Sequence, residues 1–231
     1  MNFTVAQIAK MIDHSILRPE FTVDDVRAGC AVAAKYDVAS VCVRPCDVPA
    51  AVALLDGTTV RIGTVIGFPH GDSATQIKVA ETELAVDQGA TEIDMVLNIG
   101  WLRSGDIASV ENEIGSVVKA AGEAHVKVIL ETAYLTDEQK LAACGAAERA
   151  GAAFVKTSTG FAPTGATVDD LALMRSAVSA AVQVKASGGI RSLDTVLAMA
   201  AVGVTRFGTS ATADILDDLA RRRPDAAGDQ A

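Results

Sequence analysis

Short runs rich in Val and Ile alternate along this chain with longer segments in which apolar residues recur at helical spacing. The alternation repeats about every 22 to 33 residues, which is typical of strand–helix units in a parallel sheet. Buried parallel strands read as continuous apolar runs because helices cover the outer face of the sheet. We predict a strand over each such run, namely 11–17, 39–44, 60–67, 92–98, 127–131, 153–157, 183–187 and 205–209.

Capping signals mark where helices begin and end between these strands. A Ser or Thr followed three residues later by a carboxylate or amide side chain satisfies free N–H groups of the first helical turn. Such pairs are Thr22 with Asp25, Ser73 with Gln76, Thr136 with Gln139, and Thr167 with Asp170. Glycines between a predicted helix and the next strand mark helix ends, where we expect left-handed backbone. They are Gly89, Gly151 and Gly203.

Strand–helix units that follow one another without a Pro-, Gly- or Ser-rich linker favour a closed barrel over an open sheet. We therefore predict an α/β fold, a (β/α)8 TIM barrel with an extra N-terminal helix over residues 1–10 that caps the bottom. A doubly wound sheet is the alternative, but it would carry a Gly-x-Gly-x-x-Gly turn after an early strand, and none is present. Since barrels of about 200 to 250 residues commonly form one domain, we assign residues 1–224 to a single barrel domain and 225–231 to a mobile C-terminal tail.

Composition narrows the functional classes. Because 20 Lys and Arg stand against 29 Asp and Glu, the net charge is −9, and no overall positive field attracts a nucleic acid backbone. The N-terminal segment lacks the basic and apolar regions of a signal peptide, and no apolar run is long enough to cross a membrane. The cysteines form no Cys-x-x-Cys pair, so we expect free thiols. These features predict a cytoplasmic protein with no nucleic acid and no membrane as partner.

Two lysines inside apolar strands depart most clearly from the pattern of a buried sheet. Lys156 and Lys185 stand at positions that face a covered interior, and lysine is rarely buried without a reason. A structural interpretation pairs them with Asp94 and Glu131. A chemical interpretation is that a second ammonium and desolvation lower the pKa of one lysine until its neutral amine attacks a carbonyl and forms a Schiff base.

Small and hydroxyl-bearing residues cluster after the sixth, seventh and eighth predicted strands. Barrel active sites form at the carboxyl ends of the strands, and phosphate groups commonly bind the loops after strands seven and eight. We therefore predict a substrate and phosphate site there, together with one residue from the end of the first strand. The predicted binding residues are Asp13, Thr159, Gly160, Gly188, Gly189, Gly208, Thr209 and Ser210.

Eight motifs spread along the chain resemble those of the 2-deoxyribose-5-phosphate aldolase family, class I aldolases with a barrel fold. The resemblance extends from Ile12 to Ser210. The motifs are IDHSIL at 12–17, VCVRP at 41–45, GFPHG at 67–71, EIDMVLNIG at 92–100, KVILET at 127–132, FVKTSTGF at 154–161, VKASGGIR at 184–191 and RFGTS at 206–210.

The resemblance implies catalytic roles for three residues. Lys156 matches the lysine that forms the Schiff base with acetaldehyde, Lys185 the lysine that perturbs it and takes part in proton transfer, and Asp94 the carboxylate of the proton relay. The implied reaction is the reversible cleavage of 2-deoxy-D-ribose 5-phosphate into acetaldehyde and D-glyceraldehyde 3-phosphate, in deoxyribonucleotide catabolism. The implied partners are this small phosphorylated sugar and acetaldehyde, and neither a metal nor another cofactor is implied.

Some positions depart from the family pattern. Phe161 stands where some relatives carry a lysine after the TSTG run, and Ala211 and Thr212 stand where many continue with Ser or Gly. These departures leave the affinity for phosphate open. Cys42 in VCVRP has two interpretations, a small buried thiol or a thiol that reacts with aldehydes, and we favour the buried one.

Other functional classes stay open from the residues alone. A metal-dependent aldolase or isomerase could use the same fold, and a sugar-phosphate-binding barrel could lack catalysis. The histidines argue against a metal site, because His14 and His70 lie at predicted upper strand ends whereas His125 lies at the bottom. Apolar helix faces such as 193–202 are compatible with a homo-oligomer.

Overall fold

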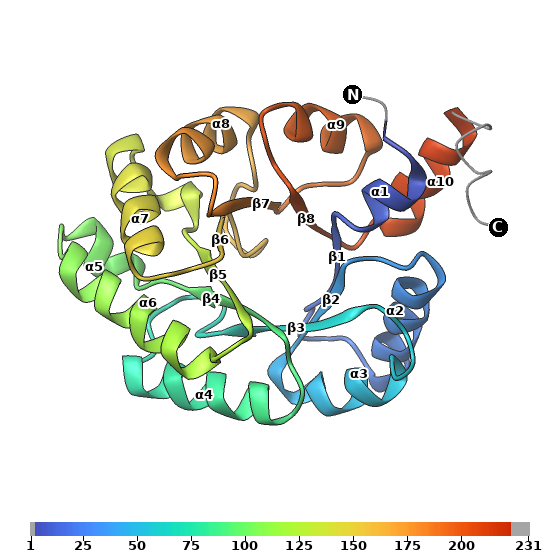
Figure 1. Cartoon of the computed structure of the whole chain (residues 1–231), viewed down its shortest axis with the longest axis horizontal. Helices are drawn as coiled ribbons and strands as arrows, with labels where there is room; N and C mark the ends of the chain where they lie inside the picture. Colours follow the sequence, from blue (N-terminus) through green and yellow to red (C-terminus); the bar gives the residue numbers. More distant parts are fainter. Residues whose placement is uncertain (1–2, 223–231) are drawn as a thin grey trace.

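The chain folds into a closed barrel of parallel strands surrounded by helices (Figure 1). The computed structural model describes residues 3–222, and in it the strands pair in chain order from β1 to β8 and back to β1. The predicted TIM barrel is therefore confirmed, with one strand inside each predicted run or within two residues of it. The strands are β1 (Ile12–Ile16), β2 (Ser40–Val43), β3 (Arg61–Ile66), β4 (Glu92–Val96), β5 (His125–Ile129), β6 (Phe154–Lys156), β7 (Gln183–Ser187) and β8 (Arg206–Thr209).

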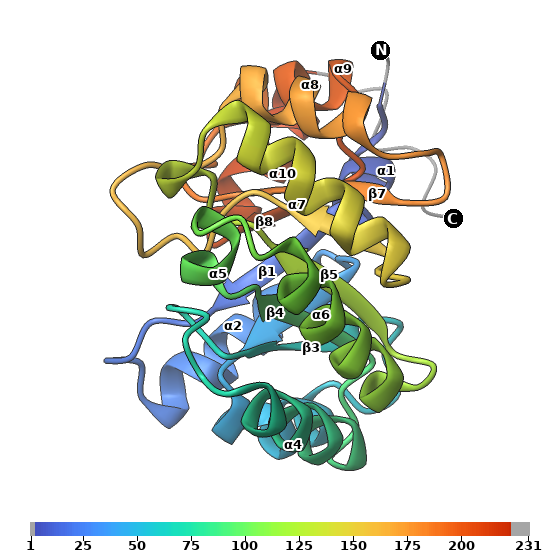
Figure 2. The ribbon, with the colours of Figure 1, turned by 90° about the vertical axis from the view of Figure 1, so that its left-hand side faces the viewer.

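Helices form the outer ring and cover the apolar outer face of the strands (Figures 1 and 2). Short 3-10 turns, η1 (Pro45–Asp47) and η2 (Thr132–Tyr134), follow β2 and β5. The α-helices are α1 (Val5–Ala9), α2 (Val23–Lys35), α3 (Val48–Leu54), α4 (Thr75–Asp87), α5 (Ile99–Arg103), α6 (Ile107–Ala121), α7 (Asp137–Arg149), α8 (Val168–Ala177), α9 (Leu193–Ala201) and α10 (Thr212–Arg222).

Three of the four predicted helix caps are confirmed. Thr22, Thr136 and Thr167 each accept a hydrogen bond from the backbone N–H three residues later. The cap at Ser73 is wrong, because α4 begins one residue later and its N-cap is Ala74, which has no side-chain cap. The ammonium of Lys78 on α4 donates to the carbonyls of Gly71 and Val96, which ties this end of the helix to the preceding loop and to β4.

The predicted helix ends are confirmed by their backbone. Gly89, Gly151 and Gly203 have φ values of 104°, 86° and 94°, in the region that favours glycine. Each therefore turns the chain from the end of a helix into the next strand, and successive βα units keep their register.

The extra N-terminal helix is present as α1. It packs beside α10 at the rim of the barrel rather than across its lower opening (Figure 1). The predicted tail over 225–231, and the predicted end of the domain at residue 224, lie outside the described residues. None of the helices within 3–222 is both long and apolar enough to span a bilayer.

Strand register brings the unusual polar residues together inside the barrel. Lys156 on β6 pairs in register with Lys185 on β7, and Asp94 on β4 pairs with Lys127 on β5. Parallel pairing places in-register side chains on the same face of the sheet, which here is the barrel interior. The fold therefore collects charged groups from strands that are far apart in the sequence.

Candidate active site

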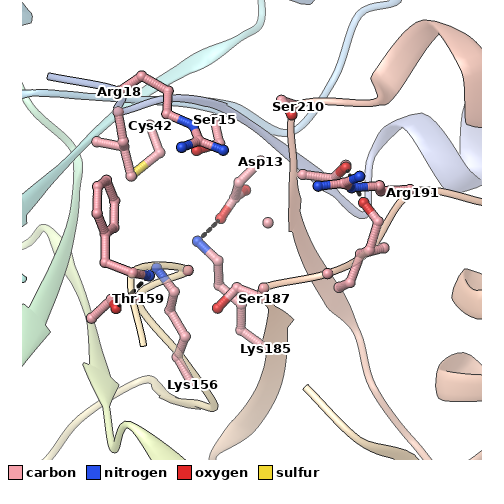
Figure 3. Close-up of a pocket in the computed structure, with 18 of the residues that line it drawn as sticks. Asp13, Ser15, Arg18, Cys42, Lys156, Thr159, Lys185, Ser187, Arg191 and Ser210 are labelled. Carbon is pink, nitrogen blue, oxygen red and sulfur yellow. Dashed lines mark hydrogen bonds and ion pairs between the residues drawn. The ribbon is translucent and has the colours of Figure 1, made fainter. Parts of the chain in front are cut away.

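A cavity of about 200 Å³ opens at the carboxyl ends of the strands, over β1, β2, β6, β7 and β8 (Figure 3). It is lined by all of the predicted site residues except Asp94, which is buried directly beneath it. Residues from the first strand and from the last three meet here because the barrel closes between β8 and β1. The predicted site residues thus form one site and not two.

The floor of the cavity is an ionic cluster with Asp94 at its centre. Lys156 Nζ and Lys185 Nζ each donate to Asp94 Oδ2 over 2.7 Å. Lys185 also donates to Asp13 Oδ2 over 2.5 Å, whereas Lys156 has no second carboxylate among the described ion pairs. All four side chains are buried. Lys185 is therefore bound by two carboxylates and Lys156 by one.

A second layer of charges lies below this cluster and was not predicted. Lys127 Nζ donates to Glu92 Oε2 over 2.6 Å and to Asp94 Oδ1 over 2.8 Å. Arg206 Nη1 donates to Asp13 Oδ1 over 2.7 Å and to Glu92 Oε1 over 3.2 Å. Both oxygens of Asp94 and of Asp13 are thereby engaged, and the two upper lysines stand on a fixed network.

Three arginines of the family-like motifs, Arg44, Arg191 and Arg206, lie in different places. Arg206 lies in the barrel interior, as described above, and Arg44 pairs with Asp47 while also donating to backbone carbonyls of the loop before α2. Arg191 lines the cavity together with Arg18, which sequence reasoning missed. Figure 3 shows Arg18 and Arg191 on opposite sides of the cavity, with Asp13 between them. Two cations thus line the cavity on opposite sides.

The pKa values of the two lysines that share Asp94 are shifted in opposite directions. Burial and the nearby ammonium of Lys185 lower the pKa of Lys156, against the attraction of the Asp94 carboxylate. Burial also acts to lower the pKa of Lys185, but the carboxylates of Asp13 and Asp94 outweigh it and raise that pKa. Although burial opposes ionisation of Asp94, the three surrounding lysines hold its pKa well below the usual range. Of these two lysines, Lys156 is therefore the more readily deprotonated, and its neighbour Lys185 holds its proton more firmly.

Glycines and hydroxyls form the wall on the side of β7 and β8. Gly188 and Gly189 have φ values of 85° and 79°, and a β-carbon on Gly165 would lie 2.2 Å from the carbonyl oxygen of Gly188. Thr209 Oγ1 donates to the Ile190 carbonyl, so this hydroxyl holds the loop in place. The loops after β6 and β7 thus pack backbone against backbone at this wall, with no room for a side chain at Gly165.

The departures from the family motifs fall in three different environments. Phe161 lines the cavity, and its ring meets that of Phe68 edge to face, with centroids 5.3 Å apart. Ala211 lies just beyond the cavity wall, and its N–H donates to Thr209 Oγ1. Thr212 is buried, with its hydroxyl 2.8 Å from Nδ1 of His14. Phe161 is therefore the departure that changes the cavity surface.

Cys42 lines the cavity but is 4% exposed. Burial raises the pKa of its thiol to about 11, so the sulfur is protonated near neutral pH. Because the thiolate is the reactive form, this agrees with the inert interpretation of Cys42. Within the described residues, no group of three or more His, Cys, Asp or Glu side chains is arranged to hold a metal ion.

The structural interpretation of the sequence pairs Glu131 with one of the two lysines. Among the described ion pairs, Glu131 pairs with neither Lys156 nor Lys185. Its buried carboxylate accepts hydrogen bonds from Thr159 instead. Burial raises the pKa of this carboxyl group, against the hydrogen bonds from Thr159. It belongs to the wall of a second cavity of about 270 Å³, which shares Thr159 and Phe161 with the first.

The closed barrel and its buried lysine–carboxylate cluster define a barrel enzyme of the aldolase class. The chain belongs to the DeoC/LacD family of aldolases, whose family model matches residues 7–215. The match covers the barrel from α1 to α10 and includes every predicted site residue.

Relatives with curated names extend this finding. The deoxyribose-phosphate aldolase of Caldanaerobacter subterraneus subsp. tengcongensis is 50% identical over 218 residues, which cover 93% of this chain and 94% of the relative. That of Thermoanaerobacter sp. (strain X514) is 51% identical over 214 residues, covering 91% and 96%. Among solved structures, the tetrameric deoxyribose phosphate aldolase of Aeropyrum pernix superposes with a TM-score of 0.87 at 31% identity, covering 93% of this chain and 92% of that chain.

Proposed function

We propose that this chain cleaves 2-deoxy-D-ribose 5-phosphate reversibly into acetaldehyde and D-glyceraldehyde 3-phosphate through a Schiff base on Lys156. The proposal is supported by the family membership and by relatives of that name about 50% identical over most of the chain. The single observation that carries the mechanism is that Lys156 and Lys185 donate to one oxygen of Asp94 at the floor of the cavity.

The first step is the attack of the neutral Lys156 amine on the aldehyde carbon C1 of the open-chain sugar. The carbinolamine then loses water, and an iminium forms between Nζ and C1. The lowered pKa of Lys156 raises the fraction of neutral amine near neutral pH. The charged Lys185 beside it donates hydrogen bonds and can supply the proton that the departing water requires.

Cleavage of the bond between C2 and C3 follows from the iminium. A base removes the proton of the C3 hydroxyl, the C2–C3 electron pair moves into the enamine on Lys156, and C3 leaves as the aldehyde of D-glyceraldehyde 3-phosphate. Protonation of the enamine and hydrolysis release acetaldehyde. We assign the proton relay to Asp94 and Lys185, because their shared hydrogen bond lies next to the nitrogen that carries the intermediate.

The phosphate is assigned to the wall on the side of β7 and β8. Gly188, Gly189, Gly208 and Ser210 line the cavity there and offer backbone amides and a hydroxyl to a phosphate, and Arg191 supplies a cation. Asp13 is a poor ligand for a phosphate because its ionised carboxylate repels an anion. Its oxygens accept from Lys185 and Arg206, and we assign it to Lys185 instead. Arg18 lines the cavity on the side opposite Arg191.

A coupled assay tests the proposal. Wild-type protein should release D-glyceraldehyde 3-phosphate from 2-deoxyribose 5-phosphate in the presence of a chelator, whereas Lys156→Met should release none. Loss of turnover with the chelator would favour a metal-dependent aldolase. Binding of the sugar phosphate by both proteins without turnover by either would favour a barrel that only binds its ligand.

We also propose a cytoplasmic homo-oligomer. The cysteines of the described residues are free thiols, which suits a reducing compartment. The relative from Aeropyrum pernix is tetrameric, and the exposed side chains of Ile77 and Leu84 on α4 offer apolar surface to a second copy. Light scattering after size exclusion would give the mass in solution, and a monomer at micromolar concentration would contradict this part of the proposal.

A further inference from the structure

Glu131 has a backbone conformation that is uncommon for a residue with a β-carbon. It lies just beyond the end of β5 with φ 58° and ψ 65°, in the left-handed region. Among the described residues other than glycine, only Asp37 also has a positive φ. Such a conformation persists where the surroundings fix it, and it is often found at sites that need a side chain in one place.

The left-handed turn directs the Glu131 carboxylate at the segment that leaves β6. The N–H of Thr159 lies 3.3 Å from each carboxylate oxygen, and its hydroxyl donates to Oε2. The same hydroxyl accepts a hydrogen bond from the N–H of Phe161 over 3.1 Å. The N–H and the hydroxyl of Thr159 are therefore both engaged, by Glu131 and by the N–H of Phe161, and neither is left for a ligand.

The segment held in this way forms part of the cavity. Lys156 at the end of β6 precedes Thr159 by three residues. Thr159, Gly160 and Phe161 all line the cavity. The backbone up to Ser158 is held by β5 and β7, through bonds of Thr157 and Ser158 to their neighbours. From residue 159 to residue 165, the hydrogen bonds found in the described part of the chain are those to Glu131 and the bond between Thr159 and Phe161.

Phe161 extends the effect of this contact across the cavity mouth. Its ring rests edge to face on Phe68, which comes from the loop after β3. A shift of Thr159 would move Phe161 and open the wall that the two cavities share. The position of Lys156 depends instead on Asp94 and on the strand pairing of β6.

We propose that Glu131 is a positioning residue that fixes the Thr159–Phe161 turn and thereby sets the affinity of the cavity for the sugar phosphate. This inference rests on the proposed function, since it concerns how the same cavity holds its sugar phosphate. Glu131 does not touch the reacting atoms in this account. Its effect should therefore fall on KM for the whole substrate and not on imine formation by a small aldehyde.

The variant Glu131→Gln tests this assignment with nearly unchanged volume. Its amide can offer only one oxygen to the two donors of Thr159 and brings an N–H group against them. We expect KM for 2-deoxyribose 5-phosphate to rise on the order of 10- to 100-fold, because a displacement of about 1 Å in a positioning group has effects of this size. Trapping of acetaldehyde on the variant with cyanoborohydride should change by less than about threefold.

Two further variants keep the test decisive. Thr159→Val removes the partner hydroxyl, so it should raise KM in the same way. The KM of the double variant should be close to that of either single variant, because both changes disrupt the same interaction. Glu83→Gln, an exposed carboxylate on α4, is the matched control and should leave KM unchanged. An unchanged KM in Glu131→Gln, or equal losses in KM and in trapping, would overturn the positioning role. Failure of the proposed function itself would instead appear as absent turnover by the wild-type protein.

Discussion

Lys156 and Lys185 donate hydrogen bonds to the same carboxylate oxygen, Oδ2 of Asp94, each over 2.7 Å. The two amines differ only in what else surrounds them: Lys185 has Asp13 as a second carboxylate, and Lys156 does not. The shared contact therefore gives one amine that loses its proton readily and one that keeps it. We propose that this asymmetry makes Lys156 the nucleophile and Lys185 the proton donor, although the two residues are of the same type.

The variant Lys185→Met should raise the pKa of Lys156. The Lys185 ammonium favours the neutral form of Lys156, and its removal also leaves Asp94 free to attract the Lys156 charge. The pH midpoint for imine formation should move to higher pH, and each unit of pKa should reduce the neutral amine at pH 7 about tenfold. Cyanoborohydride trapping of acetaldehyde as a function of pH measures this midpoint. An exposed control, Lys119→Met, should leave it in place, and a midpoint that moved to lower pH in Lys185→Met would contradict the account.

Much of this arrangement could be predicted from the sequence, because the hydrophobic periodicity predicts the strands and shows which charged residues fall at buried positions. Lys156 and Lys185 were recognised as anomalies in apolar strands, and the glycines after β7 and β8 marked the cavity wall. Lys127 in VKVIL shows the same signal, a lysine inside an apolar strand, and it could have been found by the same argument.

Other contacts could not be predicted, because they depend on pairing between distant segments. Lys78 shares a helix face with Thr75 and Glu81, so its sequence suggests an exposed residue, whereas its side chain is fully buried against Glu113 of α6. The αL backbone of Glu131 has no sequence signal of the kind that Gly or Asn provides. Arg206 begins β8, and only barrel closure brings it to Asp13 and Glu92.

Gly165→Ala should weaken binding of the phosphorylated substrate. The added β-carbon would lie 2.2 Å from the Gly188 carbonyl oxygen, so the loops that follow β6 and β7 must move apart. We expect KM for 2-deoxyribose 5-phosphate to rise by about tenfold or more, with a smaller change for unphosphorylated 2-deoxyribose. Gly115→Ala in α6 is the control, since a β-carbon there meets nothing within 4 Å. Equal effects on both sugars would argue against a phosphate site at Gly188.

Lys78→Met should destabilise the fold. Lys78 Nζ lies 2.8 Å from Glu113 Oε2, and burial both lowers the pKa of Lys78 and raises the pKa of Glu113. Removing one partner of a buried pair leaves the other uncompensated and costs about 3 to 5 kcal/mol in the free energy of unfolding. Urea titration measures the loss.

The double variant Lys78→Met with Glu113→Gln supplies the control for this prediction. It should lose less than the sum of the two single variants, because no unpaired charge is left buried. Strictly additive losses would show that the pair does not interact in the folded protein.

The fold should lose stability as the pH falls below the ordinary range of aspartate. The pKa values of Asp13 and Asp94 are lowered in the folded state by the surrounding lysines and, for Asp13, Arg206, so the stabilisation is present above the unfolded value near 3.8. It is lost as the pH falls, by up to about 1.4 kcal/mol per pH unit for each carboxylate. Urea titrations between about pH 5 and pH 3 measure the slope. Asp13→Asn should reduce it, and an equal slope in that variant would contradict the assignment.

The most direct test of the central claim is to locate the covalent intermediate. The wild-type protein is incubated with acetaldehyde and cyanoborohydride, digested, and analysed by mass spectrometry. We predict one ethyl group on the peptide that contains Lys156, and the same ethyl group when 2-deoxyribose 5-phosphate replaces acetaldehyde, because cleavage of the sugar leaves the acetaldehyde imine on that lysine. Modification of Lys185 instead, or equal modification of exposed lysines with none on Lys156, would contradict the assignment of Lys156 as the nucleophile.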